Sequence, residues 1–214
     1  MKKLVLLLAA AMLLGLSGCR MQMDPATTAP VTTPPAATVP PTATTGPTVP
    51  STSSGTAGTG AAQLLEAIWD SYEQEERFAA YGGTVEHSVA DAPGDLNMAS
   101  ADELTNAYLI PGDLLGQVEE GASLVHMMNS NIFTAAVLKM KPTGQLRAFA
   151  DRWRSAIREN RWICGQPDRL LMLAVDEEHL LMAFGSSDAM EVFRSKAGQV
   201  YGQSRTLYDE PIVG

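Results

Sequence analysis

The sequence predicts a single α+β domain over residues 61–214. Its mostly antiparallel four-stranded sheet is built as two strand–strand–helix units, with additional N-terminal helices. Three observations predict this class: apolar residues recur at helical spacing in several segments, two pairs of short apolar strands flank polar turns, and the order strand, strand, helix occurs twice. Such a pattern favours helices packed on an antiparallel sheet.

The first element of the domain is expected to be a helix over 61–81. Apolar residues recur there every three or four positions, and Gly82-Gly83 ends the pattern. The segment 84–98 centres on a Pro-Gly turn, so we expect a loop with one short strand at 84–89.

Two short helical segments are expected next. Ser100 and Glu103 have the spacing of a capping box, in which each side chain bonds a backbone N–H at the start of a helix. They predict a helix that ends before Pro111-Gly112, and a further helical turn is expected over 113–120.

The first strand–strand–helix unit is predicted over 124–162. The segments 124–128 and 132–140 are apolar and flank an Asn-Ser-Asn turn, which is typical of a hairpin. A long amphipathic helix is expected from Gly144 to Trp162.

The second unit is predicted over 170–201. Its hairpin, 170–175 with 179–184, is apolar on both alternations, so both of its faces should be covered. A last helix is expected over 187–201, and we expect the two final helices to pack on one face of the sheet.

The N-terminus indicates where the protein acts. Lys2 and Lys3 precede an uncharged apolar run that ends at Leu16-Ser17-Gly18-Cys19. This layout is typical of a secretory signal, and the run is shorter than the roughly 20 residues of a membrane-spanning helix. The four residues resemble the lipobox of bacterial lipoproteins, which implies cleavage before Cys19 and a diacylglycerol thioether on it. The alternative is a plain secretory signal in which Cys19 has no role.

We therefore expect residues 1–18 to be a signal peptide and the mature chain to be extracytoplasmic, anchored to the bacterial cell membrane by its N-terminal lipid. Residues 19–60 are predicted to be the lipidated cysteine and a disordered tether, because 25–60 is rich in Pro and Thr and carries no charge. In polyproline II the segment 25–50 would reach about 80 Å. The tether either lifts the domain off the membrane or is a spacer with no required length.

The charge balance excludes some partners. Without the signal the chain keeps 13 basic and all 24 acidic residues, a net charge of −11. Nucleic acids and anionic membrane surfaces attract basic proteins. We therefore expect no nucleic-acid binding, and membrane contact through the lipid on Cys19 alone.

The sequence contains no familiar catalytic or cofactor motif. His87, His126 and His179 are far apart and Cys164 has no nearby second thiol, so neither a metal site nor a cofactor is expected. Cys164 lies among apolar residues and is predicted to be buried and inert. The carboxylates of 176–178 would suit acid–base work on glycosides if paired, or else lie solvated at a hairpin tip.

The candidate binding residues are Arg154, Arg158 and Asn129. The two arginines lie on the long helix, which holds the only concentration of basic residues, and would clamp an anionic polymer or a partner's carboxylates. The alternative is a solvated helix face. Asn129 would either face a ligand or fix a turn. Met127, Met128 and Met182 would either line an adaptable cleft or fill the core.

The run Ser123-Leu-Val-His-Met-Met-Asn129 resembles a motif of an uncharacterised family of secreted bacterial lipoproteins, common in Gram-positive gut anaerobes, whose domain has no known function. Members carry a Met-Met-Asn strand, a second strand, an amphipathic helix and two further apolar segments, so the resemblance covers about 104–196. His126 stands where members often have Pro. The resemblance implies location and fold, and it supplies no catalytic residues.

Two functional hypotheses follow. The first is a non-catalytic binding or interaction module, held off the membrane by the stalk, with a cell-wall polymer or an envelope protein as partner. The second is a cell-envelope hydrolase whose carboxylates are assembled by folding. Two carboxylates about 5–10 Å apart in a cleft would favour the hydrolase, whereas an apolar or arginine-lined patch would favour the binding module.

Overall fold

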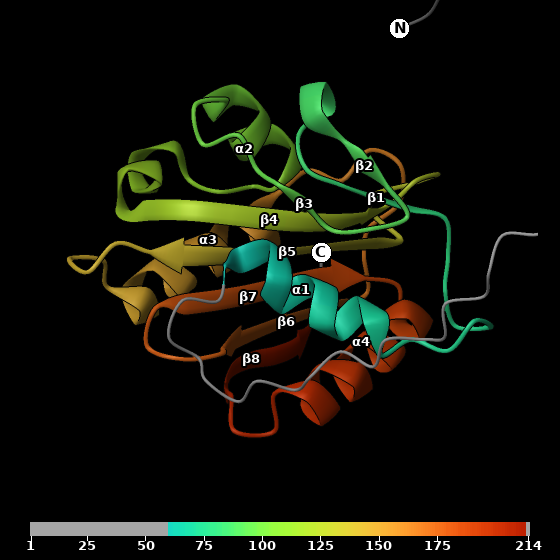
Figure 1. Ribbon diagram of the computed structural model, residues 1–214. Coiled ribbons are helices and arrows are strands. Elements are labelled where there is room, and N and C mark those ends of the chain that lie inside the picture. Colours follow the sequence, from blue (N-terminus) through green and yellow to red (C-terminus); the bar gives the residue numbers. More distant parts are fainter. Residues whose placement is uncertain (1–59, 213–214) are drawn as a thin grey trace, which may run out of the picture. The chain divides into compact units, whose positions relative to one another are not determined.

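The structure is a computed structural model that describes residues 60–212 (Figure 1). The signal peptide predicted over 1–18 and the tether predicted over 19–60 lie outside the described residues, Gly60 excepted. No helix in the described part is both long and apolar enough to cross a membrane.

Four α-helices, two 3-10 turns and eight strands make up the described chain. In order they are α1 (Ala61–Asp70), β1 (Ala80–Gly82), η1 (Val85–His87), β2 (Val89–Ala90), β3 (Gly94–Asp95), α2 (Ala101–Ala107), η2 (Gly112–Gln117), β4 (Val118–His126), β5 (Phe133–Met140), α3 (Leu146–Glu159), β6 (Arg169–Ala174), β7 (His179–Gly185), α4 (Ser187–Val200) and β8 (Arg205–Pro211).

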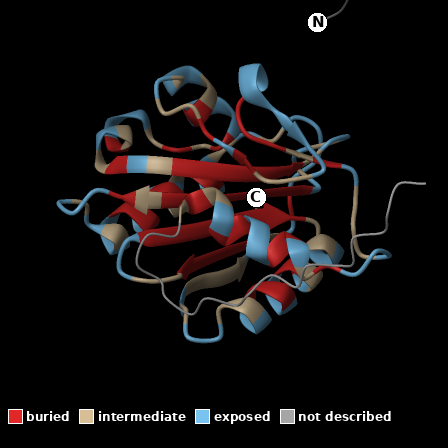
Figure 2. Cartoon of the chain, in the orientation of Figure 1, coloured by how far each residue is buried: buried red, intermediate tan, exposed pale blue. Residues whose placement is uncertain are grey.

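All the strands belong to one sheet, and every paired strand is antiparallel to its neighbour. The strand order is β2-β1-β4-β5-β7-β6-β8, and β3 also pairs with β4. The α+β class and the antiparallel sheet are confirmed, but the predicted size of four strands is wrong, because the sheet has eight. The four predicted strands correspond to β4–β7, which are consecutive in the sheet and almost wholly buried (Figure 2).

The strands that the sequence did not indicate are short or weakly apolar. β1, β2 and β3 have only two or three residues each. β8 is longer, but it is an edge strand whose residues are exposed or half-buried and include three charged side chains. A strand buried on one face shows hydrophobic alternation, and a strand buried on both faces shows a continuous apolar run. These four strands are too short or too exposed to show either pattern.

The last two helices lie on opposite faces of the sheet, so the prediction that they share a face is wrong. The α3 face carries α3, α2 and η2, and its core includes Trp153 and Leu104. The α1/α4 face carries α1 and α4, and its core includes Ile68 and Phe193. Figure 1 shows α1 and α4 in front of the sheet and α3 behind it.

Connection geometry explains this arrangement. β5 and β6 run in the same direction with β7 between them, and β7 and β8 run in the same direction with β6 between them. The connection through α3 leads from β5 to β6, and the connection through α4 leads from β7 to β8, so both cross the sheet in the direction of β8. Their starting strands, β5 and β7, run in opposite directions. Parallel crossovers are almost always right-handed, and two right-handed connections of this kind place their helices on opposite faces (Figure 1).

The first helix is shorter than predicted, since α1 ends at Asp70 instead of reaching 81. Tyr72 and Phe78 still join the core, but a loop brings them back against Trp69, with ring centroids 4.9 and 5.2 Å from it. Arg77 completes the turn by donating to the Trp69 carbonyl at 3.0 Å and lying over its indole ring. Helical spacing alone could not distinguish these contacts from a continuous helix.

The helix at α2 forms as expected, but its predicted capping box does not. Ser100 makes no side-chain capping bond. Glu103 instead accepts a hydrogen bond from the backbone N–H of Val85 at 2.8 Å, which ties α2 to the loop before β2.

A buried histidine lies at the turn between β6 and β7. His179 is 3% exposed, and its Nδ1 lies 2.9 Å from both carboxylate oxygens of Asp176. The same carboxylate accepts backbone N–H bonds from Glu178 and His179 at 2.8 and 2.7 Å. Asp176 is therefore a structural part of the turn.

The substitution Asp176→Asn should make stability less sensitive to acid. Burial alone would raise the pKa of Asp176, but the backbone hydrogen bond from Glu178 and the bonds from His179 outweigh it, and the pKa is lowered. A carboxyl group whose pKa is lowered by folding stabilises the folded state fully above its pKa in the unfolded chain, which is about 3.9. This stabilisation is lost as the pH falls through the pKa of the folded state. The free energy of urea unfolding, measured from neutral to acidic pH, should fall less steeply below pH 4 in Asp176→Asn. Glu177→Gln, at the exposed neighbour, should keep the wild-type profile, and identical profiles for all three proteins would contradict this role.

Candidate functional site

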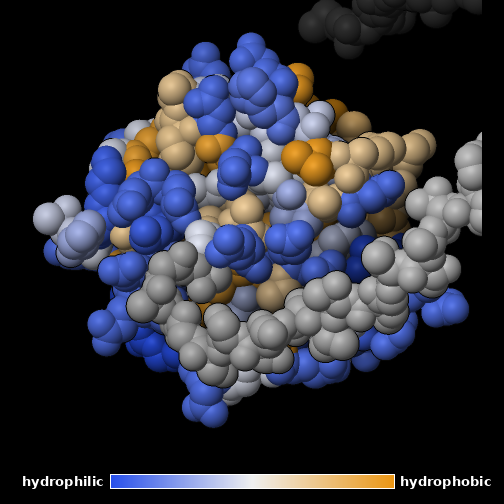
Figure 3. Space-filling model, viewed as in Figure 1, coloured by the Kyte–Doolittle hydropathy of each residue, from blue (hydrophilic) through white to orange (hydrophobic). Residues whose placement is uncertain are grey.

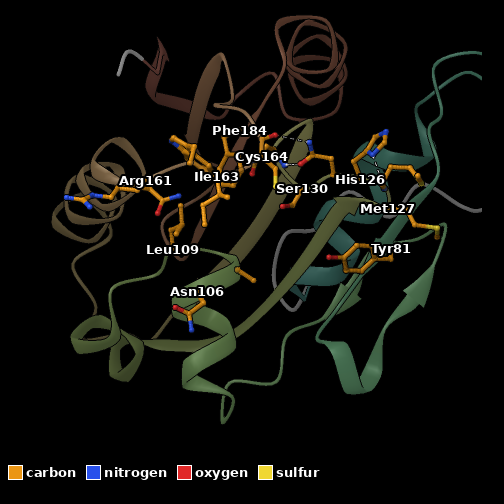
Figure 4. Close-up of a pocket in the computed structure, with 16 residues that line it drawn as sticks. Tyr81, Asn106, Leu109, His126, Met127, Ser130, Arg161, Ile163, Cys164 and Phe184 are labelled. Carbon is orange, nitrogen blue, oxygen red and sulfur yellow. Dashed lines mark hydrogen bonds between the residues drawn. The ribbon is translucent and has the colours of Figure 1, made fainter. Parts of the chain in front are cut away.

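A cleft of about 570 Å³ opens on the α3 face, at the end of the sheet where β4 and β7 end (Figure 4). Its walls are the ends of several elements: β1, the segment after α2, the β4–β5 loop, and the segment between α3 and β6. In Figure 4, Tyr81 lies across the cleft from Asn106 and Leu109, and Ser130, Cys164 and Ile163 line the side above them.

The lining of the cleft is polar but almost uncharged. It comprises Tyr81, Asn106, Ala107, Leu109, His126, Met127, Met128, Asn129, Ser130, Asn131, Asn160, Arg161, Trp162, Ile163, Cys164 and Phe184. Four of these residues are asparagines and none is a carboxylate. Arg161 is the single formal charge, and Figure 4 shows its guanidinium pointing away from Ser130 and Tyr81.

Two asparagines fix the upper wall of the cleft. The Asn129 carboxamide accepts from the backbone N–H of Asn131 at 2.9 Å and donates to the carbonyl of Cys164 at 3.3 Å. Asn131 donates to the carbonyl of Gly165 at 2.6 Å. Asn129 therefore performs the turn role and also lines the cleft, and the pair attaches the segment after α3 to the β4–β5 loop.

The Met-Met-Asn run lies at the mouth of the cleft. Met127 and Met128 are 50% and 81% exposed, and Ile163 on the facing loop is 94% exposed. Met127 and Met128 therefore line the cleft and do not fill the core, whereas Met182 is buried in the core. Exposed apolar side chains grouped around a concavity are a common mark of a binding site.

Trp162, Phe184 and His126, three aromatic residues of the cleft, already pack against other rings. Trp162 meets Phe184 edge to face with centroids 5.2 Å apart, and His126 stacks on Phe78, also at 5.2 Å. The Trp162 indole Nε1 is buried and has no hydrogen-bond partner among the described residues. Buried donors are rarely left unpaired, so this N–H is a group that an internal water molecule would satisfy.

Tyr108 holds the lower wall in place. Its hydroxyl donates to the carbonyl of Gly83 at 2.8 Å and lies 2.9 Å from the Ser123 hydroxyl, and the Trp153 indole donates to the Tyr108 carbonyl at 2.9 Å. Burial raises the pKa of Tyr108 to about 12 although the Ser123 hydrogen bond lowers it, so the hydroxyl remains a donor at neutral pH.

Leu109 follows this anchor with a strained backbone. Its φ of 56° lies in the left-handed region, where a residue with a Cβ costs about 1–2 kcal/mol and glycine is usual after a helix. The leucine side chain packs on the core of the α3 face and forms part of the cleft wall. Strain of this kind concentrates at functional sites.

The predicted arginine site is not part of the cleft. Arg154 makes two hydrogen bonds to Glu210 on β8, at 2.7 and 2.8 Å, and lies over the ring of Tyr208. The Glu210 hydrogen bond raises the pKa of Arg154. Arg158 lies 3.9 Å from the same carboxylate. The structure therefore gives Arg154 a structural role, holding α3 against the edge strand, and places Arg158 beside it.

Cys164 is exposed and lines the cleft, so the prediction of a buried thiol is wrong. The segment that carries it leaves α3 and passes over the cleft, which keeps its flanking apolar residue Ile163 out of the core. The carboxylates of 176–178 lie at the opposite end of the sheet. Within residues 60–212, no group of His, Cys, Asp and Glu side chains is placed to hold a metal ion.

Several cleft residues gave no signal in the sequence. These residues lie in or just after elements that are far apart in the chain, and only the topology brings them together: Tyr81, Asn106, Asn160 and Trp162. The one available signal was the recurrence of asparagine where α2, β4 and α3 end, since these ends meet on the same side of the sheet.

Comparison of the chain with protein-family models, with curated proteins and with solved structures gives no match.

Proposed function

We propose that this protein is a lipid-anchored lipoprotein of the bacterial cell surface, whose domain is a non-catalytic binding module that takes its ligand in the cleft at the end of β4. It belongs with the secreted lipoproteins that carry the Met-Met-Asn motif. The single observation that supports the binding role most is the composition of the cleft: exposed methionine and isoleucine at the mouth and neutral amides inside.

The same cleft counts against the hydrolase alternative. Glycoside hydrolysis needs two carboxyl groups facing the scissile bond, and none of the 16 residues that line the cleft is an Asp or Glu. The carboxylate cluster at 176–178 lies at the far end of the sheet, and Asp176 is held by its own turn and by His179. A binding role therefore accounts for the lining better.

The anchor is tested by metabolic labelling with an alkynyl fatty acid followed by cell fractionation. We expect the wild-type protein to take the label and to sediment with membranes, because two or more acyl chains anchor stably. Cys19→Ala should lose both properties. Cys164→Ala, which removes the other cysteine of the chain, should keep both, and label on Cys19→Ala would refute lipidation at this residue.

The cleft is tested through the thiol that lines it. In a chain carrying Cys19→Ser, Cys164 is the only cysteine, and its exposed position predicts ready reaction with a maleimide. A detergent extract of native envelope should slow that reaction, and a Met127→Ser/Met128→Ser form should lose the protection. Equal labelling rates with and without extract would refute a ligand in the cleft.

A further inference from the structure

The polar groups that face the cleft are neutral, and several of them are free. The Tyr81 hydroxyl and the carboxamides of Asn106 and Asn160 make no hydrogen bond within residues 60–212, in contrast to Asn129 and Asn131. Burial, followed by the nearby Glu103, raises the pKa of Tyr81, so its hydroxyl is a donor at neutral pH. In Figure 4 that hydroxyl points towards the side of the cleft that holds Asn106.

These free groups match the backbone of another chain. A carboxamide offers one acceptor oxygen and two donor hydrogens, which are the complements of a peptide N–H and C=O. The Tyr81 hydroxyl adds a donor on the opposite side of the cleft. The His126 ring adds another, because its Nδ1 accepts from the backbone N–H of Met128 at 3.2 Å and its proton is therefore on Nε2.

The apolar groups at the mouth favour aliphatic side chains over sugar rings. Thioethers repack easily around different partners, and Met127, Met128 and Ile163 are the exposed apolar residues here. A sugar would stack on a flat aromatic face. The rings of Trp162 and His126 pack against Phe184 and Phe78, and Tyr81 is the remaining ring of the lining on which a sugar would stack.

The near absence of charge in the lining also restricts the kind of ligand that the cleft can bind. No carboxylate lines the cleft to pair with a basic ligand, and the guanidinium of Arg161 points away from the other labelled residues (Figure 4). Burying an unpaired charge is costly. An occupant without charged side chains fits this lining best.

We propose that the ligand of the cleft is an extended, uncharged peptide segment with apolar side chains, bound through its backbone by Asn106, Asn160 and the Tyr81 hydroxyl and through its side chains by Met127, Met128 and Ile163. This inference rests on the proposed function, because it names the ligand class for the same cleft.

The test uses the full chain carrying Cys19→Ser in detergent micelles, with the rate of Cys164 modification by a maleimide as the readout. The probe is a pool of N-acetylated, C-amidated octapeptides of Ala, Leu, Val, Met, Thr and Gln. A second pool replaces alternate positions with Asp or Lys, and chitohexaose serves as the glycan probe. We expect the neutral pool to slow modification to a saturating limit, and the charged pool and chitohexaose to leave the rate unchanged.

Variants identify the groups that bind. Removing one hydrogen-bonding amide, in Asn106→Ala or Asn160→Ala, should raise the half-saturating peptide concentration about three- to tenfold. Gln203→Ala removes an exposed amide beyond α4, at the other end of the sheet, and should change nothing. Asn variants that behave like Gln203→Ala would overturn the assignment of these residues.

Two failures remain distinguishable. If the peptides do not slow modification while envelope extract still does, or if chitohexaose gives the protection, the peptide inference is overturned and the binding function stands. If neither peptides nor extract protect Cys164, both are overturned.

Discussion

Gly82→Ala should destabilise the domain by more than about 4 kcal/mol, a size that single substitutions reach only through a specific defect. A Cβ on Gly82 would lie 2.1 Å from the backbone nitrogen of Gly94, 2.4 Å from the carbonyl oxygen of Ser123 and 2.5 Å from the carbonyl carbon of Pro93. All three are backbone atoms, so no side-chain rotation relieves the clash. β1 and β3 pair with β4 at successive positions, and the two glycines let them approach.

Urea unfolding of the full chain measures this effect. Gly198→Ala is the matched control, because its Cβ would meet nothing within 4 Å and it lies within α4. Alanine is favoured over glycine in a helix by about 0.5–1 kcal/mol, so this variant should be as stable as the wild type or slightly more stable. A Gly82→Ala protein with the wild-type unfolding midpoint would show that β1 and β3 are not in contact.

Trp153→Ala should cost about 3–5 kcal/mol, the usual range for removing a large aromatic side chain from a core. Trp153 is fully buried in the middle of the core on the α3 face, where its ring meets Phe149 edge to face. It also donates to the carbonyl of Tyr108, the residue that anchors the lower wall of the cleft. The substitution therefore removes packing and a support of the binding site together.

Trp153→Phe separates the two contributions. It keeps most of the volume but leaves the Tyr108 carbonyl without its donor, which should cost about 1–3 kcal/mol. The free energies of urea unfolding of the two variants should therefore differ clearly. Equal losses would mean that the hydrogen bond, and not the packing, gives Trp153 its importance.

The sequence predicted the centre of the fold because the centre is where burial leaves a regular pattern. The apolar strands β4–β7, the helices α2, α3 and α4, and the α+β class are as expected. The short strands and β8 were missed, since edge strands bury little. The face on which each helix lies depends on strand order, and strand order depends on long-range pairing that no local pattern contains.

The site was predicted in part for a related reason. Met127 and Met128 stood out as adaptable thioethers and Asn129 as an amide in a turn, and all three lie at the cleft. Arg154 was a candidate binding residue because it is positively charged. Its structural role, however, depends on Glu210, which is 56 residues away in the chain. Asn106 and Asn160 are ordinary helix-end residues until the fold places them on two sides of one cleft.

The surface also differs from place to place. The face shown in Figure 3 is largely hydrophilic, and apolar residues gather on it over β1 and β2. Val85 and Val89 are 80% and 44% exposed there. Among the described residues, the other exposed large apolar side chains lie in the β4–β5 loop and in the segment after α3, namely Met127, Met128, Ile132 and Ile163.

The two ends of the described chain lie at opposite ends of the sheet, and this determines where the protein can be tagged or immobilised. The backbone N–H of Ala61 donates to Glu120 at the start of β4, whereas Ile212 is held by Asp168 and Gln166 beside the cleft. Capture on a sensor chip through residues before Ala61 leaves the cleft facing solution. A reporter fused after Ile212 would crowd its entrance, so an affinity tag belongs inside the segment between Cys19 and Ala61.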